Sequence, residues 1–186
     1  MKSNYPATAL LLLSAWGLLA PNAMAAPPVA INNQNVAERA EWVELPVSTG
    51  PAYSSAKLLP LDMPPGLSIR FGIDPETVTL GSDGVVRYVV VMRNASGSES
   101  ALYEGIRCET REVKSYARHG ASGDWVLQRD ARWRPFTDPG PSQHAPVFAR
   151  QAVCKDGSYL AQKDIIEALR KGMPPSDRYG HVTSPN

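Results

Sequence analysis

The sequence predicts an α+β domain: an antiparallel β-meander sheet with a C-terminal helix packed on it and one disulfide. Residues 85–93 are almost entirely β-branched or aromatic, with arginine only at Arg87 and Arg93. That composition is typical of a central strand covered on most of both faces. Polar turn sequences separate further short strand-like segments, and near the C-terminus the apolar spacing changes to that of a helix.

The strand-like segments that precede this central strand are shorter. Residues 67–71 alternate apolar and polar side chains, which is the period of a half-buried strand. Residues 76–80 are a second candidate strand. Residues 81–84, Gly-Ser-Asp-Gly, predict a tight turn because Gly and Asp tolerate positive φ. We therefore expect the core of the domain to begin near Leu67.

Residues 101–117 form the longest strand-like region. Ile106 and Cys108 share one parity, whereas Val113, which we also expect to point inward, has the other. One regular strand cannot bury both sets on the same face. The sequence therefore predicts a β-bulge or bend between residues 109 and 112.

The C-terminal third mixes turns with a helix. The Gly-rich residues 119–124 predict a hairpin that returns through residues 125–127. Residues 133–142 have the composition of a loop, and residues 146–154 fit either a helical turn or a strand. Residues 162–171 predict a helix, because their apolar side chains form one stripe, acids lie near the start and bases near the end, and glycine follows.

The chain has two cysteines, Cys108 and Cys154. In an exported protein an even pair is most simply a disulfide. A redox-active pair or a metal-binding pair is the alternative. Redox pairs usually lie two residues apart, and a single pair without clustered histidine makes a poor metal site. We expect a structural disulfide and no bound metal or cofactor.

The N-terminus predicts export. Lys2 precedes an apolar run over residues 7–20, and Ala23-Met24-Ala25 offers small residues where a signal peptidase cleaves. A retained membrane anchor is the alternative, but the run is shorter than the roughly 20 residues that span a bilayer. The predicted organisation is a signal peptide (1–25), an extended Pro-rich leader and docking segment (26–66), the sheet-plus-helix domain (67–173) and a flexible tail (174–186).

Charge and motifs exclude several classes of function. The whole chain carries a formal net charge of +1, whereas nucleic acid and anionic membranes select an excess of Lys and Arg. We therefore expect no nucleic-acid partner and no stable membrane insertion. The sequence contains no phosphate-binding loop, nucleophile elbow or metalloprotease motif. Its three histidines, His119, His144 and His181, are far apart in predicted loops or the tail.

One stretch, residues 104–134, combines arginines with aromatic side chains. Exposed arginine beside aromatic rings is the chemistry that binds anions, sugars and protein partners. The alternative is ordinary structure, because acids share the stretch, cross-strand ion pairs are common on solvated sheets, and the tryptophans could be core. The candidate binding residues are Tyr103, Glu104, Arg107, Tyr116, Trp125 and Trp133.

Several segments carry a resemblance to a known family. Residues 84–91, Ser96-Gly97 and above all residues 103–108 (Tyr-Glu-Gly-Ile-Arg-Cys) resemble the cryptic neisserial protein-like family. Tyr116-Ala117, Gly123-Asp124-Trp125, Trp133 and Cys154 continue the similarity in order. The resemblance implies an exported, periplasmic protein of the bacterial envelope. It supplies no activity, and this chain departs from lipoprotein members in lacking a lipid-bearing cysteine.

The function expected from these observations is a non-enzymatic binding or interaction module of the bacterial envelope. Its partner would be an envelope protein or an anionic or glycan ligand. The alternative is a hydrolase acting on cell-wall or other anionic material. That reading requires two carboxylates, such as Glu104 and Glu109, to meet in a pocket with strongly shifted pKa values.

Overall fold

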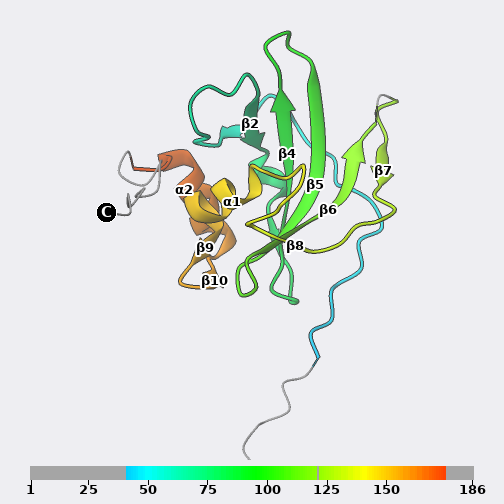
Figure 1. Cartoon of the computed structure of the whole chain (residues 1–186), viewed down its shortest axis with the longest axis vertical. Coiled ribbons are helices and arrows are strands. Elements are labelled where there is room, and N and C mark those ends of the chain that lie inside the picture. Colours follow the sequence, from blue (N-terminus) through cyan, green and yellow to red (C-terminus); the bar gives the residue numbers. More distant parts are fainter. Residues whose placement is uncertain (1–40, 121, 175–186) are drawn as a thin grey trace, which may run out of the picture. The chain divides into compact units, whose positions relative to one another are not determined.

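A computed structural model describes residues 41–120 and 122–174 of the chain. The predicted signal peptide, the first part of the Pro-rich leader and all but the first residue of the predicted tail lie outside the described residues. The described part contains one antiparallel sheet with two helices, α1 and α2, on one side of it (Figure 1). The predicted α+β class, with a meander and a C-terminal helix, is therefore confirmed.

The sheet is a meander extended at one edge. Its strands run antiparallel in the order β1-β2-β4-β5-β6-β7, with β3 paired to β4 and β8 paired to β6. A separate hairpin, β9–β10, follows the helical segment. The bounds are Leu59–Pro60 (β1), Arg70–Ile73 (β2), Thr79–Leu80 (β3), Val86–Arg93 (β4), Glu99–Arg107 (β5), Glu112–His119 (β6), Trp125–Leu127 (β7), Arg134–Pro135 (β8), Cys154–Lys155 (β9) and Ser158–Tyr159 (β10).

Strand β4 is the centre of the sheet, as its composition predicts. Its residues 86–91 are all buried, so side chains of both parities are covered. On one face Tyr88 and Val90 join the core beneath the helices. On the other face Val89 and Val91 join a smaller core. A strand buried on both faces needs apolar residues at every position, which explains its near-continuous β-branched sequence.

The predicted bend between residues 109 and 112 is a full reversal of the chain. β5 ends at Arg107, β6 begins at Glu112, and the Arg111 N–H donates to the Cys108 carbonyl across the turn, 3.3 Å from N to O. The strand-like region over residues 101–117 is therefore two strands joined by a tight turn, where a bulge or bend was expected. A register shift does occur in this pair, at Tyr103/Glu104. It leaves Tyr116 as an extra residue on β6, so Tyr116 and Ala117 lie on the same face.

Other strand predictions need smaller corrections. The strand predicted at 67–71 lies at Arg70–Ile73, after an exposed loop. In the segment 76–80, Pro75–Thr77 form a 3₁₀ turn capped by the Asp74 side chain, and only Thr79–Leu80 pair with β4. A proline at the first position with an Asp cap favours a helical turn over a strand.

The helices cover the face of the sheet that carries Tyr88. The ambiguous segment is helical: α1 (Ala145–Phe148) continues as a π-helical turn over Ala149–Val153. The predicted second helix is confirmed as α2 (Gln162–Lys171), and Gly172 ends it with φ +71°. Buried Ile165 and Leu169 place its apolar stripe in the core with Phe148.

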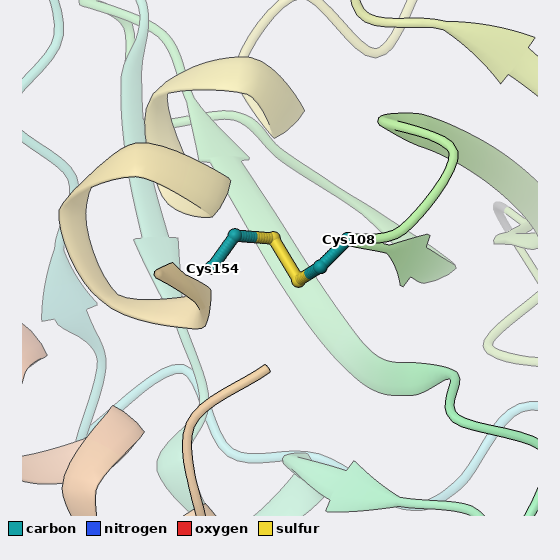
Figure 2. The surroundings of a disulfide bond; sticks show 2 residues. All are labelled: Cys108 and Cys154. Atoms are coloured by element: carbon teal, nitrogen blue, oxygen red, sulfur yellow. A yellow bond between two sulfur atoms is a disulfide. The ribbon is translucent and has the colours of Figure 1, made fainter. Parts of the chain in front are cut away.

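The predicted disulfide is confirmed between Cys108 and Cys154 (Figure 2). It joins the turn after β5 to the first residue of β9, so it ties the sheet to the end of the helical segment. The two Cα atoms are 5.5 Å apart, within the normal range for such a bond. Phe148 and Ile106 lie in the same core cluster as Cys108.

Candidate binding surface

The candidate surface lies on the face of the sheet opposite the helices. Tyr103 and Arg107 of β5 alternate with buried residues that face the helices, and Tyr116 joins them through the bulge in β6. Residues 41–54, which form no helix or strand and are called the strap below, lie across this face. The fold therefore brings these three candidate residues together, and Trp125 and Trp133 join them, so five of the six candidates share one face.

Arg107 is the centre of an aromatic cluster. Its guanidinium carbon lies 3.6 Å from the ring centroid of Trp42 and 5.6 Å from that of Trp133. The two indole rings meet edge to face, 5.9 Å between centroids. Glu112 is the ionic partner of Arg107, at 3.6 Å from Nη1 to Oε2. Stacking on an indole leaves the edge of a guanidinium available for hydrogen bonds to a carboxylate or phosphate.

A cavity of about 270 Å³ opens beside this cluster. Trp42, Arg107 and Tyr159 line it, together with the turns at Gly84 and Gly157. Tyr159 is 46% exposed, so its ring is accessible from solvent. Two aromatic rings and an arginine around a small open cavity form a surface on which a planar anion or a sugar ring can stack.

Glu44 of the strap lies between two side chains of the candidate surface. Its Oε2 accepts from Lys114 Nζ at 2.8 Å and from Trp133 Nε1 at 3.2 Å. Burial raises the pKa of the Glu44 carboxyl, but Lys114, Tyr116 and Trp133 together outweigh burial and lower it. For Tyr116, burial and Glu44 raise the pKa of the phenol far above its usual value. Glu44 is therefore held as a carboxylate beside a neutral Tyr116.

The remaining two aromatic candidates lie farther along the same face. Tyr103 contacts Tyr116 at 5.5 Å and Trp125 at 6.3 Å between centroids. Trp125 in turn packs on Tyr53 of the strap at 5.8 Å, and its indole N–H donates to the Pro51 carbonyl at 2.9 Å. These rings form a continuous row across the sheet, but the strap covers this end of it.

Glu104 lies on the opposite face, among the core residues. It is 0% exposed. Its Oε1 accepts from Ser142 Oγ at 2.5 Å, while its Oε2 accepts from the Tyr88 hydroxyl at 2.7 Å and lies 2.7 Å from His144 Nε2. Burial raises the pKa of the carboxyl, but the charge of His144 and the hydrogen bonds from His144, Ser142 and Tyr88 lower it overall. Glu104 is therefore a buried hydrogen-bonding partner of core residues, and it does not reach the candidate surface.

The comparison with protein families identifies the chain. The model of the CNP1-like family matches residues 37–170. The chain belongs to the CNP1-like family. No curated protein and no solved structure matches it.

The matched region of this CNP1-like chain contains the whole described surface. It begins ahead of the strap, so Trp42 and Glu44 lie within the matched region. Sequence reasoning assigned neither residue to the surface. Their alternation of a tryptophan and an acid in an extended, Pro-flanked segment is the signal that could have found them.

The two carboxylates of the hydrolase alternative do not meet in the CNP1-like domain. Glu104 is sealed in the core with a lowered pKa, whereas Glu109 lies on the exposed turn between β5 and β6. A general acid needs a raised pKa, so Glu104 does not fit that role. Among residues 41–120 and 122–174, no three His, Cys, Asp or Glu side chains are grouped so that they could hold a metal ion. No helix of this described part is long and apolar enough to span a bilayer.

Proposed function

We propose that this CNP1-like protein is an exported, periplasmic binding module of the bacterial envelope, without a catalytic role. In this proposal the CNP1-like family is the same as the cryptic neisserial protein-like family that the sequence resembles. The signal-peptide pattern over residues 1–25 supports export, and cleavage after Ala25 is the expected processing step. A Cys108–Cys154 bridge fits an oxidising compartment.

The binding site is the open cavity beside Arg107, and its ligand is an anionic or glycan group of the envelope. One observation carries this assignment: Arg107 is stacked on Trp42 at the wall of a cavity whose other side presents the half-exposed ring of Tyr159. The guanidinium supplies charge and directional hydrogen bonds, and the two rings supply flat apolar faces. A protein partner would engage the same three residues through an acidic side chain.

Photo-crosslinking in cells tests this proposal. A benzophenone amino acid replaces Tyr159, which lines the cavity, or Lys163, which is exposed on α2 and serves as the control. The expected result is an adduct from position 159 that is absent from position 163 and is lost when Arg107→Ala is added. Mass analysis of the adduct distinguishes a glycan from a protein. Equal adducts from both positions, or an adduct that survives Arg107→Ala, would contradict the site.

A further inference from the structure

The strap crosses the sheet in an extended conformation, with alternate side chains turned toward the sheet. Trp42 and Glu44 are partly buried against it, whereas Val43 is 76% exposed and Leu45 is 42% exposed. This is the period of a strand, yet the strap belongs to neither sheet. Side chains of the domain bind its backbone instead, at Leu45, Pro51 and Ser54. That is how a groove binds an extended peptide.

A buried ion pair forms hydrogen bonds with the backbone of the strap at Leu45. Arg87 Nη2 and Asp83 Oδ2 are 2.6 Å apart, and both side chains are almost fully buried. The same Asp83 oxygen accepts from the Leu45 N–H at 2.8 Å, and the same Arg87 nitrogen donates to the Leu45 carbonyl at 3.2 Å. One donor and one acceptor therefore bind the backbone N–H and C=O of a single residue, irrespective of its side chain.

Two side-chain sites flank this clamp. Trp42 packs on Arg107, and its indole N–H donates to the Asp83 carbonyl at 2.8 Å. Glu44 binds Lys114 and Trp133 as described above. The exposed Pro46 follows, so the strap carries the pattern aromatic-x-acid-x-Pro, of which the sheet face contacts the aromatic residue and the acid. A carboxylate between an ammonium and an indole N–H is selected by charge as well as by shape.

The sheet face contacts the strap at a third point, Gly50, which lies six residues beyond Glu44. The backbone of Gly50 lies flat on the Trp125 ring, and a Cβ added there would lie 2.4 Å from ring carbons. The Trp125 indole N–H donates to the carbonyl of the next residue, Pro51, at 2.9 Å. A carbonyl bound by a tryptophan N–H beside a proline is a recurring feature of grooves that bind Pro-containing segments. No larger residue than glycine fits at this point.

The strap fills its groove incompletely. A cavity of about 240 Å³ lies on its β6 side, between Pro46 and Lys114. Another of about 370 Å³ lies on its β4 side, between Val47 and Arg87. Both cavities are open to solvent, so they leave room beside the strap, although its Val47 and Tyr53 pack on the smaller core. Specific polar contacts combined with loose flanks are the properties of a bound, exchangeable peptide.

We infer that this face of the sheet is a peptide-binding groove, which the chain's own residues 41–54 occupy in the absence of a partner. The partner is a protein segment that is extended and acidic, with the spacing aromatic-x-acid-x-Pro and a Gly-Pro pair four residues after that proline. Such a segment displaces the strap and takes over its contacts with Asp83, Lys114 and Trp125. This inference concerns a different ligand from the one proposed at the cavity beside Arg107, and its test does not use Tyr159.

The test opens the chain without removing any part of it. A specific protease site is inserted between the exposed residues Ala56 and Lys57. A fluorophore is attached to the amino terminus of the chain, and the folded protein is then cleaved at the inserted site, which leaves the label on the fragment that contains the strap. Fluorescence anisotropy then follows the strap while unlabelled synthetic peptide 41–54 is added. We expect the fraction of labelled strap that is released to rise with the concentration of added peptide. The near-ultraviolet circular dichroism of the core is expected to stay unchanged when the peptide takes the place of the strap.

Matched peptides make the result specific. A Gly50→Ala peptide is expected to compete about tenfold or more weakly, because its methyl group overlaps the Trp125 ring. A Ser48→Ala peptide, changed at an exposed position, is expected to compete like the original. A peptide that keeps only Trp42, Glu44, Pro46, Gly50 and Pro51 and changes the other positions is expected to compete within a few fold, whereas a permuted one does not.

Four outcomes would overturn the inference. The labelled strap could stay bound at every peptide concentration, or its release could be accompanied by loss of the core's circular dichroism; both would make the strap an integral part of the fold. Equal competition by the Gly50→Ala and Ser48→Ala peptides would show that the groove does not require glycine at position 50. Exchange only between two copies of the intact chain, seen as a dimer, would assign the groove to self-association instead of a partner.

Discussion

Glu104 and His144 form a completely buried pair, with 2.7 Å between Oε2 and Nε2. Glu104 lies in the middle of β5, and His144 immediately precedes α1. The pair therefore connects the sheet to the helical layer at the centre of the domain. Tyr88 and Ser142 donate to the same carboxylate, so each of its oxygens has at least one partner. Removing one member leaves the others buried without their partner.

His144→Ala is expected to lower the free energy of unfolding by about 3–5 kcal/mol, because it leaves the buried Glu104 carboxylate without one of its partners in the core. Urea denaturation at neutral pH measures the change. Gln143→Ala is the matched control, since Gln143 is exposed and adjacent in the sequence. A loss below about 1 kcal/mol for His144→Ala would mean that the pair contributes little.

Stability is expected to fall in acid, and Glu104 is one source of this dependence. The pKa of Glu104 in the folded state is lowered from its ordinary value of 4.5. Its contribution is therefore fully present above pH 4.5 and is lost as the pH falls through the lower, folded-state pKa. Tyr88, Ser142 and His144 face the carboxylate.

The measurement compares urea unfolding of the wild type and Glu104→Gln between pH 7 and pH 3. The variant is expected to be less stable at pH 7, with a difference that narrows as the pH falls below 4.5. Asp83 and Glu44 also have lowered pKa values and contribute their own acid dependence in both proteins. A constant difference across this range would show that Glu104 ionisation is not linked to folding.

The Cys108–Cys154 bridge is expected to stabilise the fold by about 4 kcal/mol through chain entropy, with a range of about 2–5 kcal/mol. Its sequence separation is 46 residues, and a closed loop of that size restricts the unfolded chain. The double variant Cys108→Ser, Cys154→Ser is compared with the oxidised wild type by urea denaturation. Equal midpoints for the two proteins, or for the wild type with and without reductant, would show that the bridge does not stabilise the fold.

The elements with strong local patterns could be predicted from the sequence. Residues 85–93 and Gln162–Lys171 carry unbroken strand and helix patterns, and the fold class follows from them. The turn after β5 lies where a bulge or bend was predicted, but the full reversal was missed because Arg111 takes a positive φ of 57°, which its residue type does not signal. The short strands β1 and β8 are defined only by their pairing partners, so no local pattern identifies them.

The surface could be predicted only in part, because it depends on which residues the sheet brings together. Arg107, Tyr116 and Trp133 were found by their composition, and they do cluster. Trp42 comes from a segment distant in sequence, so nothing local links it to Arg107. Glu104 was grouped with the surface although it shares its parity with Ile106. A carboxylate at an inward position of an apolar strand indicates a buried partner, which is His144.

The most direct test of the account is a titration of the oxidised protein followed by tryptophan fluorescence, since Trp42 and Trp133 both flank Arg107. The probes are soluble muropeptides and acidic glycans released from purified cell wall. We predict a saturable change for the wild type and for Arg118→Ala, whose arginine is exposed elsewhere on β6, and its loss in Arg107→Ala. No saturable change in the wild type, or the same binding curve for a folded Arg107→Ala protein, would contradict a binding role for the cavity.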